Sequence, residues 1–534
     1  MGALTLKTFP FELRGWDIEK FESIDPTDGF GSSTRVYIKN NQIIQIEPDY
    51  NSYSFNSWLT DKGRQFFDGI FMNDQKKSVD ISWLKIFKSL QQNIYLYDHC
   101  NLQSKIVYYF IIIFENVSLE VLSILNIISQ NYSFIKVKRA QKMKLKNDLE
   151  TSFQINLGIK TEALSISTLC LLINTNPRYE GFQLNLKLKQ RILKGNFKCF
   201  SIGSVFNSTF PVFFLGSTYT IFKTIVEGNH LICQNLKSSR NPIIVLNNDI
   251  FHREDGQNIL KVFTTLKNTN VFTKNWNGLN ILNSSLHEIG IYSTAQFLPV
   301  TLNDLNNFSS LYFINTNIEN CANLKRIIEL KTLILLSNKN DQPNYNHLVL
   351  DQNYYKHINK SNSDLLTTNK WHIKYFFIPT SMFYENNETY INTQGFIKKT
   401  TKVVLNNNTR SNWQILRKLL KIFNTNFILL SNSHDMISFN STKLTLFKSF
   451  ISFQFFATQD LSHISHYLKI KNKPFNLYKN DFSFYKIQSS KIWNTKFKYW
   501  LDDFFVGGKD EYSQHSTILT NCSKVLRTES TNFF

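Results

Sequence analysis

The sequence predicts an α/β protein in which a small N-terminal β-rich domain precedes stacked, open and mostly parallel α/β sheets. Two observations carry this prediction: short apolar runs that end in Asn-rich loops, and helix-like stretches that lie between these runs. Continuous apolar runs are typical of strands buried on both faces, and the alternation of strand and helix is typical of parallel sheets. Hydrophobic residues make up 42% of the 534 residues, which argues for a sizeable core and against wholesale disorder.

The first predicted element is a β-hairpin. Residues 35–39 and 42–46 are β-rich runs joined by Asn40 and Asn41, and Asn tolerates the positive φ of a tight turn. Before the hairpin, Gly29-Phe30-Gly31 has half of a dinucleotide-binding fingerprint, but no helix-like stretch follows it, so we expect a plain turn. We expect the small β-rich domain to span residues 17–73.

The α/β region is expected to span residues 74–430. Its strongest predicted strands lie at residues 165–173, 243–246, 311–314 and 332–336. Its clearest predicted helices lie at residues 183–193 and 413–423. Beyond residue 431 the pattern degrades, and we expect an irregular C-terminal extension at residues 431–534.

The charge balance raises the question of nucleic acid. There are 60 Lys and Arg residues against 40 Asp and Glu, a formal net charge of +20, and the densest basic stretch is residues 136–146. Basic patches contact phosphates, but this stretch lacks the interleaved aromatic side chains that stack on bases. Because the Lys excess is spread over the whole chain, we expect a solvated or partner-facing loop at residues 136–146, and no nucleic-acid partner.

No segment of the sequence is expected to cross a membrane. A transmembrane helix needs about 20 apolar residues, and the longest apolar run is residues 106–114, which Glu115 ends. Acidic residues such as Glu12 and Asp17 come too early for an Arg-rich, acid-poor transit peptide. We therefore expect a soluble or peripheral protein. If it works in an organelle, we expect that it was made there or that its import signal was removed.

The cysteines are scattered. Six are present, none in a CxxC pair, so no zinc ribbon or ferredoxin-type motif can be built locally. We expect reduced, mostly buried thiols and no metal site. His463 and His466 stand three apart but have no third ligand nearby, and Ser433-His434-Asp435 cannot form a catalytic triad because triads are spatial and not sequential.

One loop has the position of a ligand site. The segment Thr175, Asn176, Pro177 and Arg178 follows a strong predicted strand and precedes a helix. In open α/β sheets ligands bind at the carboxyl ends of strands, and a helix N-terminus favours phosphate. The segment is therefore a candidate nucleotide loop, and the alternative is a proline-containing connection.

Several segments, in order along most of the chain, resemble one family. They are residues 2–5, 14–16, 22–25, 58–62, 171–180, 275–276 and 390–395, and Asp503-Phe504-Phe505 followed by Ser516-Thr517 and Cys522. Together they resemble the large (75 kDa) iron–sulfur subunits of respiratory complex I, the NADH:ubiquinone oxidoreductase. The resemblance implies that the second part of this chain is similar to the molybdopterin oxidoreductases.

The resemblance also bears on cofactors. In molybdopterin oxidoreductases the small domain carries a Cys-ligated cluster, but residues 22–46 contain no cysteine. Those enzymes cradle the pterin nucleotide with an Asn-x-Glu-Gly-Arg pattern, and the matching positions here are Asn392, Gln394, Gly395 and Phe396. Phe cannot offer an anion the charged fork of Arg. The resemblance thus implies vestigial nucleotide loops and neither a catalytic residue nor a cofactor in this chain.

The resemblance begins partway through the family's subunit, next to its last cluster ligand. This implies a split, mitochondrially encoded polypeptide whose N-terminal arm, residues 1–16, contacts a separate cluster-bearing chain. The expected contact residues are Gly2, Ala3, Leu4 and Thr5. The expected function is a structural subunit of the matrix arm of mitochondrial complex I, peripheral to the inner membrane, that scaffolds electron transfer from NADH to ubiquinone. The alternative is a stand-alone nucleotide- or molybdopterin-binding α/β oxidoreductase.

Overall fold

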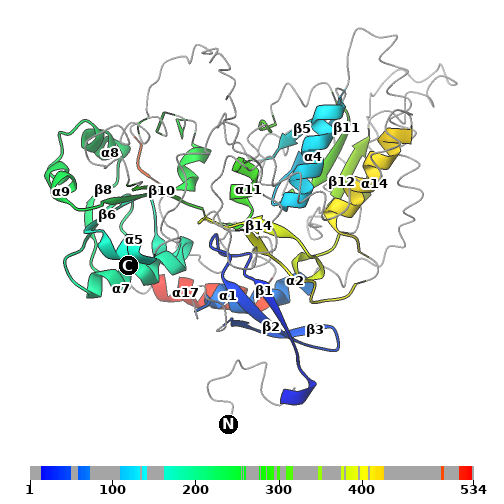
Figure 1. Cartoon of the computed structure of the whole chain (residues 1–534), viewed down its shortest axis with the longest axis horizontal. Coiled ribbons are helices and arrows are strands. Elements are labelled where there is room, and N and C mark those ends of the chain that lie inside the picture. The colour runs from blue at the N-terminus through cyan, green and yellow to red at the C-terminus, as the bar shows by residue number, and fades with distance from the viewer. Residues whose placement is uncertain are drawn as a thin grey trace, which may run out of the picture.

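In the computed structural model of the chain, the described residues fall into three spatial parts (Figure 1). The structure describes residues 14–49, 58–71, 109–132, 135–140, 161–253, 255–256, 258–259, 262, 276, 278–283, 285–293, 297–300, 308–316, 347–351, 374–377, 380–394, 397–406, 409–425, 495–497 and 516–531. Figure 1 shows two lobes, each built around a five-stranded sheet, with a small β domain below and between them. Over the described residues, no helix has the length and apolar character that a membrane crossing needs.

The small domain begins with a short helical turn, η1 (Gly15–Asp17), and an antiparallel sheet of three strands. The strands are β1 (Glu19–Ile24), β2 (Ser33–Lys39) and β3 (Gln42–Pro48). The predicted hairpin between β2 and β3 is confirmed, since Asn40 and Asn41 have φ of 50° and 66°. Two positive φ values in a row define a type I′ turn, the geometry that matches the twist of paired strands.

Distant segments complete the core of the small domain. Helices α1 (Asp61–Gln65) and α2 (Phe67–Phe71) follow the sheet, and Phe66 stacks on Tyr384 with ring centroids 5.8 Å apart. Helix α17 (Thr517–Thr531) returns from the C-terminal region, and Leu519 is fully buried in the same core. The carboxylate of Asp68 accepts the Ile518 N–H at 3.2 Å, which ties the start of α17 to α2. The sequence pattern did not reveal α17.

The first lobe holds a mixed sheet in the order β13-β12-β11-β4-β5. Its strands are β4 (Tyr109–Phe114), β5 (Ile135–Arg139), β11 (Phe308–Ile314), β12 (His347–Asp351) and β13 (Lys374–Phe377). Strands β5, β4 and β11 run parallel, and β12 and β13 are antiparallel additions. Its helices are α4 (Leu119–Asn131), α11 (Glu288–Ser293) and α14 (Asn412–Thr425), and a small hairpin of β14 (Thr389–Ile391) and β15 (Ile397–Lys399) lies beside α4.

The second lobe holds a wholly parallel sheet in the order β10-β9-β6-β7-β8. Its strands are β6 (Leu169–Ile173), β7 (Lys198–Ile202), β8 (Phe213–Gly216), β9 (Ile243–Asn247) and β10 (Leu279–Leu282). Its helices are α5 (Thr161–Ile166), α6 (Pro177–Glu180), α7 (Phe182–Leu193), α8 (Tyr219–Val226) and α9 (Ile232–Ser238), with η3 (Asn248–His252) after β9.

The predicted fold class is therefore confirmed, with local differences. The strand expected from residue 165 begins only at Leu169, because residues 161–166 form α5. The predicted helices at 183–193 and 413–423 match α7 and α14, and the predicted strands at 243–246 and 311–314 match β9 and β11. The predicted strand at residues 332–336 lies outside the described residues.

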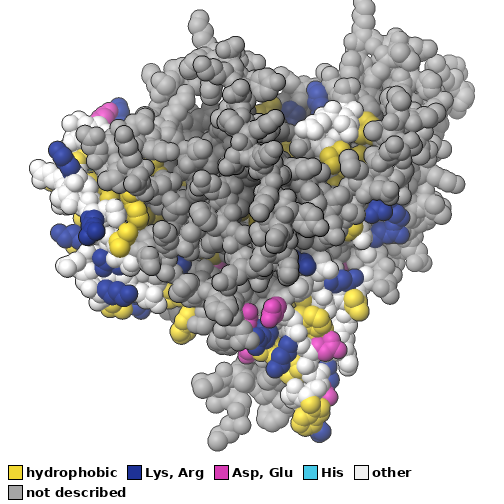
Figure 2. Space-filling model, viewed as in Figure 1, with side chains coloured by type: hydrophobic (Ala, Val, Ile, Leu, Met, Phe, Trp, Pro, Cys, Tyr) yellow, Lys and Arg dark blue, Asp and Glu magenta, His cyan; other side chains and the backbone are white. Residues whose placement is uncertain are grey.

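The prediction of a loop at residues 136–146 is wrong for its first four residues. Ile135–Arg139 form strand β5, and the alternation of apolar and basic residues places Ile135 and Val137 in the core. Arg139 is itself buried, with 3% of its surface exposed. Residues 141–146 lie outside the described residues. On the face in Figure 2, Lys and Arg side chains are scattered over both lobes and the small domain.

The four cysteines within the described residues are free thiols. Cys170 and Cys199 face each other across β6 and β7 and are buried, while Cys233 and Cys522 are partly exposed. A side-chain hydrogen bond with Cys170 and burial raise the pKa of the Cys199 thiol well above its usual value. Burial is thus confirmed for Cys170 and Cys199 and not for Cys233 and Cys522, and the reduced state of the thiols stays a prediction; Cys100 and Cys321 lie outside the described residues.

Candidate functional site

The parallel sheet of the second lobe has one topological switch point, at the carboxyl end of β6. From β6 the chain adds β7 and β8 on one side and later adds β9 and β10 on the other. The connection after β6 and the connection after β9 therefore lead to opposite sides of the sheet. Open α/β sheets hold their ligands at the carboxyl ends of two such neighbouring strands. Thr175 follows β6 and Asn248 follows β9, so the sequence-predicted loop lies at this point.

The predicted loop is held by its own hydrogen bonds. The Thr175 hydroxyl donates to the Ile173 carbonyl at 2.9 Å and is buried. The Asn176 side-chain oxygen accepts the Arg178 N–H at 3.2 Å, and Pro177 occupies the first position of α6, where its missing N–H does no harm. The loop is thus a well-capped strand-to-helix connection.

The hydrogen-bond donors that a phosphate would need at this loop are already bonded to the Glu180 carboxylate. Glu180 Oε2 accepts the Asn176 N–H at 3.0 Å, and Glu180 Oε1 accepts the Asn247 side-chain amide at 2.5 Å. The Arg178 guanidinium donates to the Asn207 carbonyl at 3.4 Å and lies 5.6 Å from the Tyr179 ring. Helix α6 has only four residues, so its dipole is weak. The residues present therefore do not fit a nucleotide phosphate.

A turn of the small domain packs against the second lobe near this loop. Phe30 is buried in a core with Leu184 and Leu282, on one side of the parallel sheet. Asp28 shapes the turn by accepting the Phe30 N–H at 3.1 Å and the Ser32 hydroxyl at 2.8 Å. Burial raises the pKa of the Asp28 carboxyl, although both hydrogen bonds act in the opposite direction. We call residues 28–32 the wedge turn.

The wedge turn is also fixed to the second lobe by close backbone contact. Gln183 donates from its amide to the Ser32 hydroxyl at 2.6 Å. A Cβ atom added to Gly29 would lie 2.0 Å from the Asn283 carbonyl oxygen, at the end of β10. Only glycine permits this approach. The expectation of a plain turn at residues 29–31 is therefore confirmed, and the turn has a structural task.

The second predicted motif meets the same turn from the first lobe. The Asn392 amide donates to the Phe30 carbonyl at 3.0 Å, and Thr393 donates through its N–H and its hydroxyl to the Gly29 carbonyl, both at 2.8 Å. The Gln394 N–H donates to the Asn392 side-chain oxygen at 3.1 Å. Gly395 and Phe396 lie outside the described residues. The Asn392 segment therefore contacts the wedge turn directly. The loop at Thr175 leads through α6 into α7, and Gln183 of α7 bonds to the same turn.

A buried acidic cluster lies behind the Asn392 segment, and sequence reasoning missed it. Glu120 of α4 accepts the N–H of Thr389 at 3.1 Å and its hydroxyl at 2.5 Å. Glu388 accepts the Tyr390 hydroxyl at 2.6 Å, and burial, with the charge of Glu120, raises the pKa of Glu388 to about 7. The His287 ring meets the Tyr390 ring edge-on, with the ring centroids 4.9 Å apart. Burial lowers the pKa of His287 to about 4. No local pattern joins residues so far apart in the chain.

The remaining candidate residues lie outside the described residues: Gly2 to Thr5, Ser433 to Asp435, His463 and His466. Within the described part of the chain, no three His, Cys, Asp or Glu side chains come together in a way that could hold a metal ion.

Two family models match the chain. The molybdopterin oxidoreductase model matches residues 72–422. The model described as NADH-ubiquinone oxidoreductase NDSU1/NuoG-like, 4Fe-4S domain matches residues 18–68. The second match stands against the expectation of no cofactor. However, residues 18–68 contain no cysteine, and a 4Fe-4S cluster is held by cysteine thiolates. The residues present in this segment therefore do not fit a cluster.

Curated relatives carry related names. The NADH-ubiquinone oxidoreductase 75 kDa subunit of Reclinomonas americana is 28% identical over 79% of this chain and 60% of its own length. The subunit of the same name from Acanthamoeba castellanii is 26% identical over 88% of this chain and 66% of its own length. The mitochondrial NADH dehydrogenase (ubiquinone) iron-sulfur protein 1 of Solanum tuberosum is 24% identical over 79% and 53%. This chain thus spans about 60% of the relatives that it matches.

Proposed function

The chain belongs to the molybdopterin oxidoreductase family, and from this premise we propose that it works as a structural subunit of mitochondrial respiratory complex I. In this proposal it scaffolds the iron–sulfur chain that carries electrons from NADH to ubiquinone and has no redox centre of its own. The names of the relatives support membership of that complex. The observation that carries the scaffold role is the wedge turn packed against the second lobe near the switch-point loop.

The residues of the switch-point loop and of the Asn392 segment serve packing in this proposal. Glu180 holds the Asn176 N–H, and Thr393 and Asn392 hold the wedge turn, so side chains that would face a ligand are bonded to protein. Electron transfer between centres depends on fixed distances. A chain whose small domain is tied to both lobes therefore contributes to the reaction by keeping neighbouring chains in register.

The alternative is a stand-alone nucleotide- or molybdopterin-binding oxidoreductase. The position of Thr175 at the switch point favours it, because ligands of open α/β sheets bind there. The Glu180 carboxylate argues against it for two reasons. Its negative charge repels phosphate, and it already accepts the Asn176 N–H of the loop. We therefore propose that the loop at Thr175 to Arg178 and the motif at Asn392 to Phe396 are vestigial.

The proposed partners are the other subunits of the complex, above all a chain that bears iron–sulfur clusters. We propose that Gly2, Ala3, Leu4 and Thr5 form part of this contact, on the matrix side of the inner membrane. The proposal rests on the resemblance of this segment to the family and on the lack of cysteine in residues 18–68.

Native gel electrophoresis of organelle membranes tests both statements. A tagged full-length chain is expected to migrate with the band that stains for NADH dehydrogenase activity. Deletion of residues 2–5 is expected to release the chain from this band, whereas deletion of residues 531–534 serves as a control of the same length. Migration of the intact chain apart from that band would contradict the complex I assignment, and an unaffected band after the first deletion would contradict the contact.

A further inference from the structure

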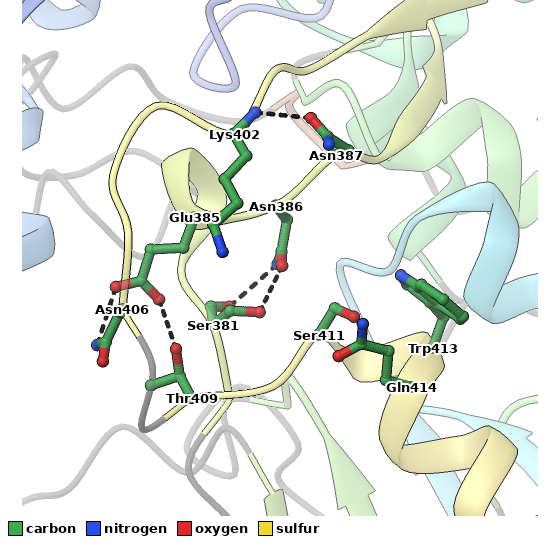
Figure 3. Close-up of a pocket in the computed structure, with 10 residues that line it drawn as sticks. All are labelled: Ser381, Glu385, Asn386, Asn387, Lys402, Asn406, Thr409, Ser411, Trp413 and Gln414. Carbon is green, nitrogen blue, oxygen red and sulfur yellow. Dashed lines mark hydrogen bonds between the residues drawn. The ribbon is translucent and has the colours of Figure 1, made fainter.

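The pocket in Figure 3 lies between the segment that precedes β14 and the start of α14. The carboxylate of Glu385, in its lining, accepts the Met382 N–H at 2.9 Å, the Asn406 amide at 3.1 Å and the Thr409 hydroxyl at 3.0 Å. Figure 3 shows this carboxylate pointing toward Asn406 and Thr409. The hydrogen bonds of Glu385 thus hold protein segments together, and we assign the pocket no ligand.

The outer edge of the parallel sheet in the second lobe is open. Strand β8 is the last strand of this sheet and pairs with β7 on its inner side. Among the described residues, no strand of the sheet pairs along its outer side. Figure 1 shows β8 on the side of the lobe that faces away from the first lobe. A strand at an open edge presents unpaired N–H and C=O groups, which are a template for a further strand.

The side chains of β8 are apolar and exposed on both faces of the sheet. Phe213 is 57% exposed and Phe214 is 37% exposed, and successive side chains of a strand point to opposite faces. The Phe213 ring contacts the Phe200 ring of one core, with centroids 5.4 Å apart. The Phe214 ring contacts the Phe206 ring of the other core, with centroids 5.5 Å apart. A further strand at this edge would therefore cover apolar surface on both faces at once.

No charge protects this edge. Residues 199–222 contain no Asp, Glu, Lys or Arg, although these residues make up 19% of the whole sequence. Soluble proteins usually place charged side chains on an open edge strand to prevent unwanted pairing. Strands β1 and β5, at the edges of the other two sheets, carry charged residues, and β10 at the opposite edge is buried along its whole length. Strand β8 differs from all three because it is both apolar and open.

A short segment of the chain already pairs at one end of this edge. Lys496 forms an antiparallel bridge with Thr218, and the Phe497 N–H donates to the Ser217 carbonyl at 3.0 Å. Phe497 is buried, and its ring meets the Tyr219 ring with centroids 6.1 Å apart. The edge therefore accepts an extended segment where the chain supplies one, whereas β8 itself stays exposed.

A second copy of this chain fits the edge poorly. In an antiparallel pair centred on β8, residues 211–212 of one copy would face residues 217–218 of the other, where residues 496–497 already lie. Only residues 213–216 of each copy could then pair, whereas a stable interface has about 20–30 residues on each side. A different chain is not bound by this symmetry and can add contacts beyond the edge.

We propose that an extended, uncharged segment of a neighbouring subunit pairs with β8 and adds a sixth strand to the five-stranded parallel sheet. The inference rests on the proposed function, which places the chain in a complex of several subunits. Backbone hydrogen bonds to β8 supply the pairing, and apolar side chains of the segment cover Phe213 on one face and Phe214 on the other. A charged side chain in the segment would lie beside these rings without a partner of opposite charge.

Hydrogen–deuterium exchange tests the pairing by comparing the isolated full-length chain with the same chain in the complex from organelle membranes. We expect the amides of residues 213–216 that point away from β7 to exchange at least about tenfold more slowly in the complex, because paired amides are protected. Residues 194–196, an exposed turn of the same lobe, are the reference and are expected to exchange equally in both samples. Equal exchange of residues 213–216 in the two samples would overturn this inference alone. Absence of the chain from the complex would overturn the proposed function and this inference with it.

A charge placed on the edge is expected to block the partner segment. Phe213→Lys is expected to lower the amount of chain in the complex band of native gels about threefold or more. Leu231→Lys is the matched control, because Leu231 is 86% exposed and lies just before α9, away from β8. Entry of both variants into the band in equal amounts, at equal melting temperatures, would contradict the proposal. If Phe213→Lys melts lower, the exchange experiment decides. A dimer of the isolated chain that Phe213→Lys dissociates would identify a second copy as the occupant and would also overturn the proposal.

Discussion

Gly29→Ala is expected to lower the free energy of unfolding by about 3 kcal/mol and to loosen the small domain from both lobes. The added Cβ would lie 2.0 Å from the Asn283 carbonyl oxygen and 2.9 Å from the Thr393 hydroxyl oxygen. One of these atoms is backbone at the end of a buried strand, so it cannot move aside cheaply. The Gly29 carbonyl would then lose its two hydrogen bonds from Thr393.

Urea denaturation and limited proteolysis measure this effect. Gly15→Ala is the matched control, because a Cβ at Gly15 meets no atom within 4 Å. Proteolysis of the Gly29→Ala variant is expected to be faster than that of Gly15→Ala. If both variants unfold at the same urea concentration, the wedge turn does not hold the small domain in place.

The second large expected effect is the change of stability with pH that the Glu388 carboxyl causes. The folded chain keeps a proton on this carboxyl up to about pH 7, whereas the unfolded chain releases it near pH 4.5. Between these values the folded state binds more protons, so stability falls as the pH rises. The shift corresponds to about 3 kcal/mol at most. Glu388→Gln removes this loss and is expected to be more stable than the original chain at about pH 8.

His287 works in the opposite direction. Its folded pKa of about 4 lies below the usual value of 6.5, so the unfolded chain takes up a proton first as the pH falls. Its contribution to stability is present above pH 6.5 and is lost toward pH 4. The two slopes oppose each other over much of the acidic range, and the Glu388 effect is expected to appear alone above pH 6.5.

Urea unfolding at several pH values between about 5 and 8 measures the effect. Glu227→Gln is the control, because this glutamate lies on the surface with 46% of its side chain exposed. We expect its pH profile to match that of the original chain. A Glu388→Gln profile with the original decline above pH 6.5 would show that Glu388 does not titrate in this way.

Parts of the fold could be predicted because their causes are local. The apolar run at β6 and the polar loop at Thr175 place a parallel strand and its carboxyl end by composition alone. The Asn40-Asn41 turn follows from the ability of Asn to adopt positive φ. Strand β5 was missed because a count of basic residues hid the alternation of Ile135 and Val137 with lysine.

The contacts around the two candidate loops could not be predicted in the same way. The contact between Gly29 and Asn283, and that between Asn392 and Phe30, join positions more than 250 residues apart. The pairing of Glu120 with Thr389 depends equally on tertiary packing. Sequence periodicity reports which side of an element is buried but not which distant segment buries it. The candidate loops could therefore be found from the sequence, but the hydrogen bonds that their side chains make with distant segments could not.

The iron, acid-labile sulfide and pterin content of the purified full-length chain tests the scaffold role most directly. The sequence has no cysteine at residues 18–68, and the Glu180 carboxylate already accepts the Asn176 N–H of the switch-point loop. The scaffold account predicts that none of the three components is present in stoichiometric amount after purification under anaerobic conditions. Stoichiometric iron with sulfide, or one pterin per chain, would contradict it.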